Sequence, residues 1–233
     1  MFSESVSCNT DVSAEVAFHL ADGFTDYLAA RVLFLAGLPK QGAVLGSTAV
    51  EKSIKAVLAT GGKVITTHVS QKHWDALVGL QPTLAAELQR DFVLLCQRVY
   101  MLRYTGDPPA GFNVVVASKE FLAELDETVC RIQLRFQLVQ DGKSRQSSFH
   151  AAHAKRDTRL WQQNHFLGGI DKTGHIAGQQ IVYEARQRQK GGAMFEIQYT
   201  SCLAPTQSGF LRAGATVSSD GKTWTLSHAY DGT

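Results

Sequence analysis

The sequence predicts a mainly α-helical protein, in which an antiparallel four-helix bundle is followed by a smaller, strand-rich mixed α/β region. Two observations lead to this fold class. Apolar residues recur every three or four positions through roughly the first 138 residues, which is the spacing of helices that bury one face. Beyond residue 140 the apolar and polar residues begin to alternate. We therefore divide the chain into a bundle (residues 1–140) and a basic linker or helix with a small β-rich extension (residues 141–233).

The first two expected helices are amphipathic. Gly37 and Pro39 end the first helix, and Gly61 with Gly62 ends the second, which we expect to begin near Gln41. The apolar residues of each helix form a stripe with helical spacing: Leu20, Phe24, Leu28, Val32 and Leu35 in the first helix, and Val50, Ile54, Val57 and Leu58 in the second.

A short segment around Trp74 precedes Pro82, which begins the next element, and the prolines at 108 and 109 force a loop after Tyr104. Ser118 is the expected N-cap of a further helix. The two later stripes are Leu88, Phe92, Leu95, Val99 and Leu102, and then Leu122, Leu125, Val129, Ile132 and Phe136. Four amphipathic helices with short links bury their stripes most simply by packing as an antiparallel bundle.

The last part of the chain has a different pattern of apolar and polar residues. We expect mixed helix and loop over residues 141–175 and mostly strand over 176–233, including strands at 180–185 and 193–200. Residues 215–218 and 223–227 flank Asp220-Gly221, a strong signal for a β-hairpin.

Composition limits the classes of protein. The 233 residues are 44% hydrophobic and 19% charged, so a packed core is expected. The four cysteines (Cys8, Cys96, Cys130 and Cys202) form no CxxC pair, and we expect Cys96 and Cys130 to be small core residues. The beginning of the sequence lacks the pattern of a secretion signal, and the apolar runs are too short for a membrane helix. We therefore expect a cytoplasmic protein without a membrane partner.

The net charge of +2 conceals a basic middle of the chain. Residues 141–190 contain nine Lys or Arg and four Asp or Glu, a net charge of +5. Within this stretch Lys143, Arg145, Lys155, Arg156 and Arg159 occur with two ring-bearing residues, Trp161 and His165. Such a surface can follow a phosphate backbone and stack a base. The alternative is a solvated face with Trp161 in the core.

Three stretches of the helical part resemble the HEPN domain family. They are DYLAARVLFLAGLPKQGAVLGSTAVEKSIKAVL (Asp26–Leu58), VYMLRYTGD (Val99–Asp107) and FLAELDETVCRI (Phe121–Ile132), and the resemblance covers about residues 15–138. It implies an up-and-down helical bundle that self-associates, as a homodimer. It also implies nucleotide or RNA binding, often beside a partner such as a nucleotidyltransferase, or RNA cleavage in a prokaryotic defence or toxin–antitoxin setting.

Four basic residues in the resembling stretches are candidates for binding nucleotide or RNA: Lys52, Lys55, Arg98 and Arg103. Lys55 also lies four residues after Glu51, the favourable order for a pair on a helix surface. Arg98 and Arg103 lie at a helix end, where a cation favours the helix dipole and can pair with an acid such as Asp91 or Asp107. The binding and the structural interpretations both remain open.

RNA cleavage without a metal needs a group of near-neutral pKa to move protons and a cation to hold the phosphate. The cleaving HEPN members carry an arginine and a histidine, separated by four to six residues, at the end of the third helix. Here no histidine lies between His73 and His150, so the histidine is missing from that place. Arg145 and His150 have the required spacing after the expected bundle. They are our catalytic candidates for the second functional hypothesis, a metal-independent endoribonuclease. The first hypothesis is binding of nucleotide or RNA.

We expect no metal and no cofactor. His150, His153 and His165 invite a zinc hypothesis, but no HExxH pattern or cysteine partner accompanies them. The glycines form neither a dinucleotide fingerprint nor a phosphate loop. A third functional hypothesis is a non-catalytic scaffold for protein interactions, in which the bundle is a dimer interface and the strands are a platform.

Overall fold

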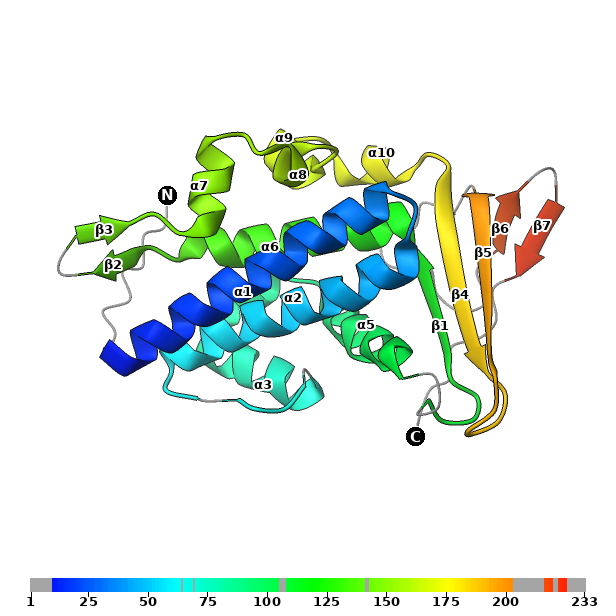
Figure 1. The fold of residues 1–233 in the computed structure, drawn as a ribbon, viewed down its shortest axis with the longest axis horizontal. Coiled ribbons are helices and arrows are strands. Elements are labelled where there is room, and N and C mark those ends of the chain that lie inside the picture. Colours follow the sequence, from blue (N-terminus) through cyan, green and yellow to red (C-terminus); the bar gives the residue numbers. More distant parts are fainter. Residues whose placement is uncertain are drawn as a thin grey trace.

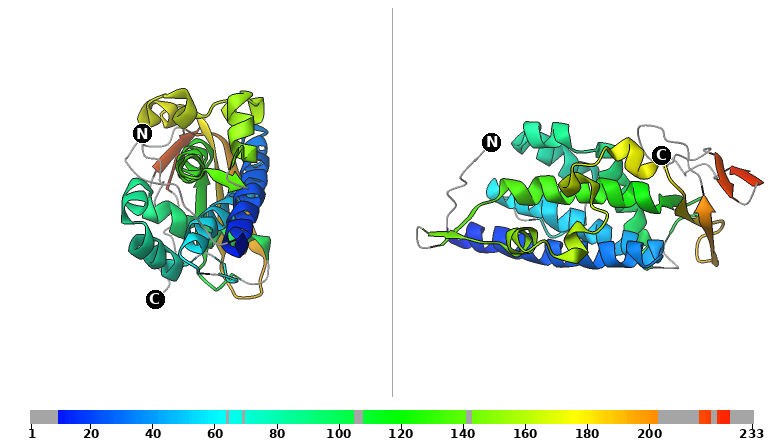
Figure 2. Two further views of the ribbon diagram at one scale, coloured as in Figure 1. Left: turned by 90° about the vertical axis from the view of Figure 1, so that its left-hand side faces the viewer. Right: turned by 90° about the horizontal axis from the view of Figure 1, so that it is seen from above.

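The structure, a computed structural model, describes residues 10–63, 65–68, 70–104, 108–140, 143–202, 216–219 and 222–225. Long helices form most of the molecule, and a small antiparallel sheet lies across one end of them (Figures 1 and 2). The expectation of a mainly helical protein with a smaller strand-containing part is confirmed. The four-helix HEPN bundle itself stays a prediction. Two further helices, α3 (Gln71–Leu80) and α4 (Pro82–Glu87), lie in the same part of the chain.

The two longest helices lie side by side and run in opposite directions (Figure 1). They are α1 (Thr10–Leu35) and α2 (Pro39–Thr60), and the turn between them uses Gly37 with a φ of 77°. A φ in this left-handed region favours glycine. α2 begins at Pro39 rather than near Gln41, since proline lacks an N–H and fits the first position of a helix.

Two further helices complete the main helical core. α5 (Arg90–Tyr100) continues into the short 3-10 helix η1 (Met101–Arg103), and α6 (Ser118–Arg135) packs across α2. Phe121 of α6 lies between rings of two other helices: its centroid is 5.3 Å from that of Phe34 and 5.0 Å from that of Phe92. Leu88 takes extended backbone between α4 and α5, so the predicted stripe from Leu88 to Leu102 is helical only from residue 90.

The principal sheet joins distant parts of the chain. Its strand order is β1-β4-β5, with β1 (Asn113–Ala117), β4 (Gln180–Gln187) and β5 (Met194–Cys202) all antiparallel. The strands expected at 180–185 and 193–200 are confirmed, whereas β1 was not predicted. Its five residues are all buried, so it lacks the alternation by which a half-exposed strand is recognised.

The expectation that Ser118 caps α6 is wrong. Ser118 is the first residue of the helix, and its Oγ accepts a hydrogen bond of 3.1 Å from the backbone N–H of Ile181. The side-chain oxygen of Gln180 takes the capping role, accepting from the N–H groups of Lys119 (2.9 Å) and Glu120 (3.4 Å). Strand β4 therefore supplies the cap of α6.

The chain after α6 forms a small hairpin and then a series of short helices. β2 (Leu138–Gln140) and β3 (Lys143–Arg145) form an unpredicted hairpin, followed by α7 (Ser148–Ala154), α8 (Thr158–Trp161), α9 (His165–Gly168) and α10 (Lys172–Ile176) (Figure 1). The mixed helix and loop expected at 141–175 is thus largely confirmed. β6 (Thr216–Ser219) pairs with β7 (Lys222–Thr225) as expected, and the Asp220-Gly221 turn lies outside the described residues.

One hydrophobic cluster spans both expected regions. Val16 through Ile132 contribute most of it, and Phe149, Leu160, Tyr183 and Ala185 from the second region are part of the same cluster. Cys96 and Cys130 are fully buried, as predicted.

A buried polar network connects residues 159–164 to α1 and α6. Arg31 of α1 and Asp126 of α6 are both fully buried and form a bidentate ion pair. Arg31 also donates to the carbonyls of Arg159 (2.8 Å from Nε) and Gln162. The Tyr27 hydroxyl donates to Asp126 at 2.7 Å and accepts from Asn164 at 3.1 Å. All three nitrogens of the Arg31 guanidinium thus donate to an oxygen, which offsets the cost of burying the charge.

Candidate functional site

A compact group of polar and aromatic side chains gathers where α2 faces the end of α5. We define the Tyr100 cluster as Glu51, Lys55, His68, Tyr100, Arg103 and Tyr104. Glu51 and Lys55 project from α2, Tyr100 ends α5, and Arg103 ends η1. The structure thereby brings together two of the predicted binding residues, Lys55 and Arg103, which are far apart in sequence.

Glu51 connects a cation to a histidine. Its Oε1 accepts from the Lys55 ammonium at 2.8 Å, and its Oε2 lies 3.1 Å from Nδ1 of His68. Burial alone would raise the pKa of Glu51, but hydrogen bonds from Lys55 and His68 outweigh it and lower the pKa. An ionised carboxylate can only accept, so Nδ1 of His68 carries the proton toward Glu51. Nε2 of His68 makes no hydrogen bond to a described residue, so in a neutral ring with the proton on Nδ1 it can act as an acceptor.

The other half of the cluster is aromatic. The ring centroid of His68 is 4.1 Å from that of Tyr100, and the Tyr104 ring lies 6.1 Å from Tyr100 in a T-shaped contact. The Arg103 guanidinium carbon is 5.1 Å from the Tyr100 centroid, within cation–π range. The His68 side chain is 60% exposed and Tyr104 is 48% exposed. Two rings and a guanidinium are therefore open to solvent on one surface.

Two other predicted binding residues of the helical part are engaged within the protein. The Lys52 ammonium lies 2.6 Å from a carboxylate oxygen of Asp22 and 2.7 Å from one of Asp26. Burial would lower the pKa of Lys52, but these two carboxylates outweigh it and raise the pKa. Arg98 donates to the backbone oxygen of Asn113 at 2.6 Å. Both cations thus already have negative or carbonyl partners that a phosphate would have to displace.

Arg145 and His150, the predicted catalytic pair, lie on successive elements, β3 and α7. Arg145 pairs with Leu138 in the β2–β3 hairpin, and its exposed side chain has no hydrogen bond or ion pair to a described residue. Ser147 caps α7 by accepting from the His150 N–H at 3.2 Å, and its Oγ is 2.8 Å from the Nδ1 of His150. Burial, and then the neighbouring His153, lower the pKa of His150. His150 is therefore held by Ser147 in the capping turn at the start of α7.

The three basic binding candidates at α7 and α8 differ in their surroundings. Lys155 is exposed without an ion pair to a described residue, and the Arg156 guanidinium lies 4.8 Å from the Trp161 ring centroid. Arg159 is bound by Asp157, with 2.6 Å between Nη2 and Oδ2. Trp161 is partly buried and donates from Nε1 to the His153 carbonyl at 3.2 Å. Lys155 and Arg156 are therefore the members of this set that stay available to a phosphate.

Among the described side chains, no group of three His, Cys, Asp or Glu residues is placed to hold a metal ion. The described helices include none with the length and apolar character needed to cross a bilayer.

The histidine of the Tyr100 cluster carried no signal in the sequence. His68 lies in a loop outside any periodic segment, and only the fold brings it to Tyr100. Tyr100, Arg103 and Tyr104 lie in the VYMLRYTGD stretch that resembles the HEPN domain. The chain matches no protein-family model, no curated protein and no solved structure.

Proposed function

We propose that this protein is a self-associating, HEPN-like protein that binds RNA or a nucleotide through the Tyr100 cluster. The observation that carries the proposal is the position of Arg103 over the ring of Tyr100, which also contacts the exposed rings of His68 and Tyr104. Exposed rings stack on bases of any sequence, and a guanidinium binds phosphate. The sequence resemblance to HEPN domains supports the same class of ligand.

The charges of the cluster suggest a modest electrostatic contribution. Lys55 and Arg103 bring two positive charges, and Glu51 removes one of them locally. One phosphate would therefore be contacted, through Arg103, which gives a salt slope of about −0.7 for a single strand. Stacking would supply most of the affinity at this surface.

Replacing Tyr104 with alanine is expected to weaken binding of a fluorescent single-stranded RNA by about tenfold to a hundredfold, because one stacked base is worth about 1–3 kcal/mol. Fluorescence anisotropy at several salt concentrations measures both affinity and salt slope. Arg103→Ala should reduce the slope by about 0.7. Phe18→Ala removes an exposed ring elsewhere (63% exposed), and Arg188→Ala removes a guanidinium that lies 5.1 Å from the Phe195 ring. These two matched controls should bind like the wild type.

Equal losses in the Tyr104 and Phe18 variants would contradict the proposed surface. Binding of neither RNA nor nucleotide at low salt would remove the whole proposal and favour the scaffold for protein interactions.

A second candidate function, a metal-independent endoribonuclease, is favoured by the contact between Glu51 and His68. Nε2 of His68 would accept the proton of a ribose 2′-hydroxyl as its oxygen attacks phosphorus. The bond to the 5′-oxygen breaks, a cyclic phosphate forms, and a proton from His68 or water neutralises the leaving oxygen. Arg103 would bind the phosphate as its negative charge increases.

Cleavage of RNA in the presence of a chelator is expected to be abolished in His68→Ala and retained in His150→Ala. Gel electrophoresis of a labelled RNA follows the reaction, and the two histidine variants serve as controls for one another. The opposite result, loss only in His150→Ala, would assign the chemistry to Arg145 and His150 instead. Wild-type protein that leaves RNA intact would eliminate the nuclease and leave the binding proposal standing.

A further inference from the structure

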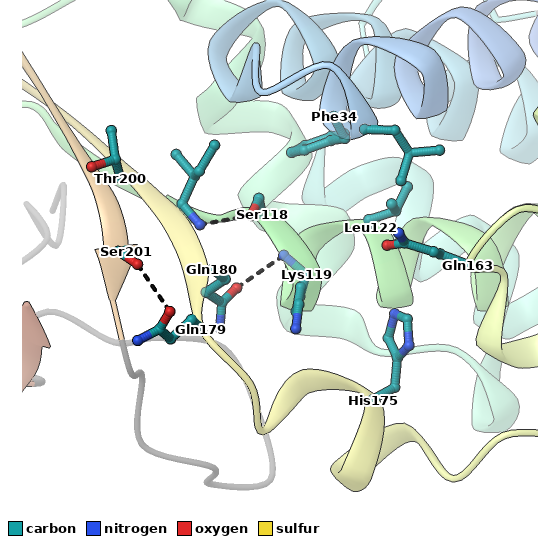
Figure 3. Close-up of a pocket in the computed structure, with 12 residues that line it drawn as sticks. Phe34, Ser118, Lys119, Leu122, Gln163, His175, Gln179, Gln180, Thr200 and Ser201 are labelled. Carbon is teal, nitrogen blue, oxygen red and sulfur yellow. Dashed lines mark hydrogen bonds between the residues drawn. The ribbon is translucent and has the colours of Figure 1, made fainter.

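A pocket of about 330 Å³ lies where the ends of α1 and α6 meet strands β4 and β5 (Figure 3). It is separate from the residues of the Tyr100 cluster. Its volume is at the lower end of the range for small-molecule sites. Helices α1, α6 and α10 and strands β4 and β5 contribute to its wall, so a ligand bound there would contact both the helices and the sheet.

Lys119 gives the pocket a positive charge. It is the one lysine or arginine among the described lining residues, and none of those residues is acidic. The Lys119 ammonium makes no ion pair or hydrogen bond to a described residue. It lies against Gly178, where an added Cβ would be 2.6 Å from Nζ. A cation with no carboxylate partner in a concave site favours an anionic ligand.

Two further side chains enter the pocket with unused hydrogen-bonding capacity. Gln163 and His175 reach it from the α8–α9 loop and from α10, on the side opposite β5 (Figure 3). The side-chain amide of Gln163 has no hydrogen bond to a described residue. Its backbone has a φ of 54°, a left-handed conformation that is uncommon outside glycine. The His175 ring stacks on His165 with centroids 5.4 Å apart.

The polar groups near the strands are already paired. Gln179 accepts from the Ser201 hydroxyl at 3.0 Å, and the Gln180 oxygen caps the amides of Lys119 and Glu120 (Figure 3). The start of α6 therefore has no free N–H at these two positions for a phosphate. Phe34 and Leu122, both buried, provide an apolar wall.

We propose that this pocket binds a small organic monocarboxylate. The Lys119 ammonium pairs with the carboxylate, Gln163 and His175 donate hydrogen bonds, and the apolar body of the ligand packs on Phe34 and Leu122. A phosphate monoester fits less well, because it carries more charge than one lysine neutralises and prefers an arginine fork or free helix amides. The inference stands apart from the RNA-binding proposal.

Phenylacetate and hexanoate are suitable probes, with phenylacetamide and hexanamide as neutral counterparts and inorganic phosphate as the competing anion. Binding to the full chain is measured by saturation-transfer NMR and by titration calorimetry. We expect the carboxylates to bind with dissociation constants of about 1 mM or tighter, and at least tenfold more tightly than their amides. Phosphate should not displace them.

Two variants of the pocket keep the test independent of folding. Lys119→Met retains the length of the side chain and should weaken carboxylate binding at least tenfold, whereas Lys72→Met, at an exposed site on α3, should leave it unchanged. Gln163→Gly suits the left-handed backbone, so it should preserve the fold while weakening binding severalfold. Equal affinity for acids and amides, retained binding in Lys119→Met, or no carboxylate binding at about 10 mM would each overturn the proposal.

Discussion

Replacing Arg31 with methionine is expected to lower the free energy of unfolding by about 3–5 kcal/mol, the cost of breaking a fully buried ion pair. The variant would leave the Asp126 carboxylate without its cation and the carbonyls of Arg159 and Gln162 without their donor. Methionine fills much of the volume, so the loss reflects unpaired polar groups rather than a large cavity. Urea unfolding followed by circular dichroism measures the change.

Two controls separate this explanation from a general sensitivity to losing an arginine. Combining Arg31→Met with Asp126→Leu removes both charges and should recover much of the lost stability, since apolar groups often replace a buried pair without cost. Arg131→Met breaks contacts to Glu87 and Glu127 that are partly exposed, and should cost about 1 kcal/mol or less. A single Arg31 variant as stable as Arg131→Met would contradict the role given to the network.

The protein is expected to lose stability in acid because of His165. The side chain is 3% exposed, and its Nδ1 has no hydrogen-bond partner among the residues that the structure describes. Burial, followed by the neighbouring His175, lowers the pKa of His165 from 6.5 to about 4. A histidine whose pKa is lower in the folded state stabilises the fold above pH 6.5. That contribution is lost as the pH falls from 6.5 toward 4, because the unfolded chain takes up the proton first.

The difference in pKa corresponds to a loss of up to about 3 kcal/mol. The test compares unfolding free energies of the wild type and of His165→Gln across this pH window, since glutamine does not titrate and carboxylates contribute equally to both proteins. The wild-type curve should fall more steeply. Parallel curves for the two proteins would show that His165 does not provide the acid sensitivity.

Local patterns in the sequence predicted the long helices α1, α2, α5 and α6, because each of these helices has apolar residues at helical spacing. The same patterns missed β1, whose Val114, Val115 and Val116 are consecutive buried residues and do not alternate. These patterns also predicted Ser118 as the N-cap of α6. The side chain that caps the helix is that of Gln180, which is remote in sequence. Capping by a distant side chain leaves no local signature.

The candidate site was only partly predictable for the same reason. Lys55 and Arg103 were identified by residue type and resemblance, whereas their connection through Glu51, His68 and Tyr100 depends on three separate segments. Charge counting likewise could not distinguish Lys52, which is held by two aspartates, from Lys119, whose ammonium has no described partner. Helical periodicity predicts which face of a helix is buried, but it does not predict which distant side chain contacts that face.

The pairing of β1 with β4 has a consequence for synthesis of the protein on the ribosome. β1 has its neighbour only after residues 180–187 have been made, although α1, α2 and α5 precede it in the chain. During that interval the nascent chain carries an unpaired, valine-rich strand immediately before α6. Such edges are prone to aggregate. We therefore expect folding yield to depend on this small sheet more than its size suggests.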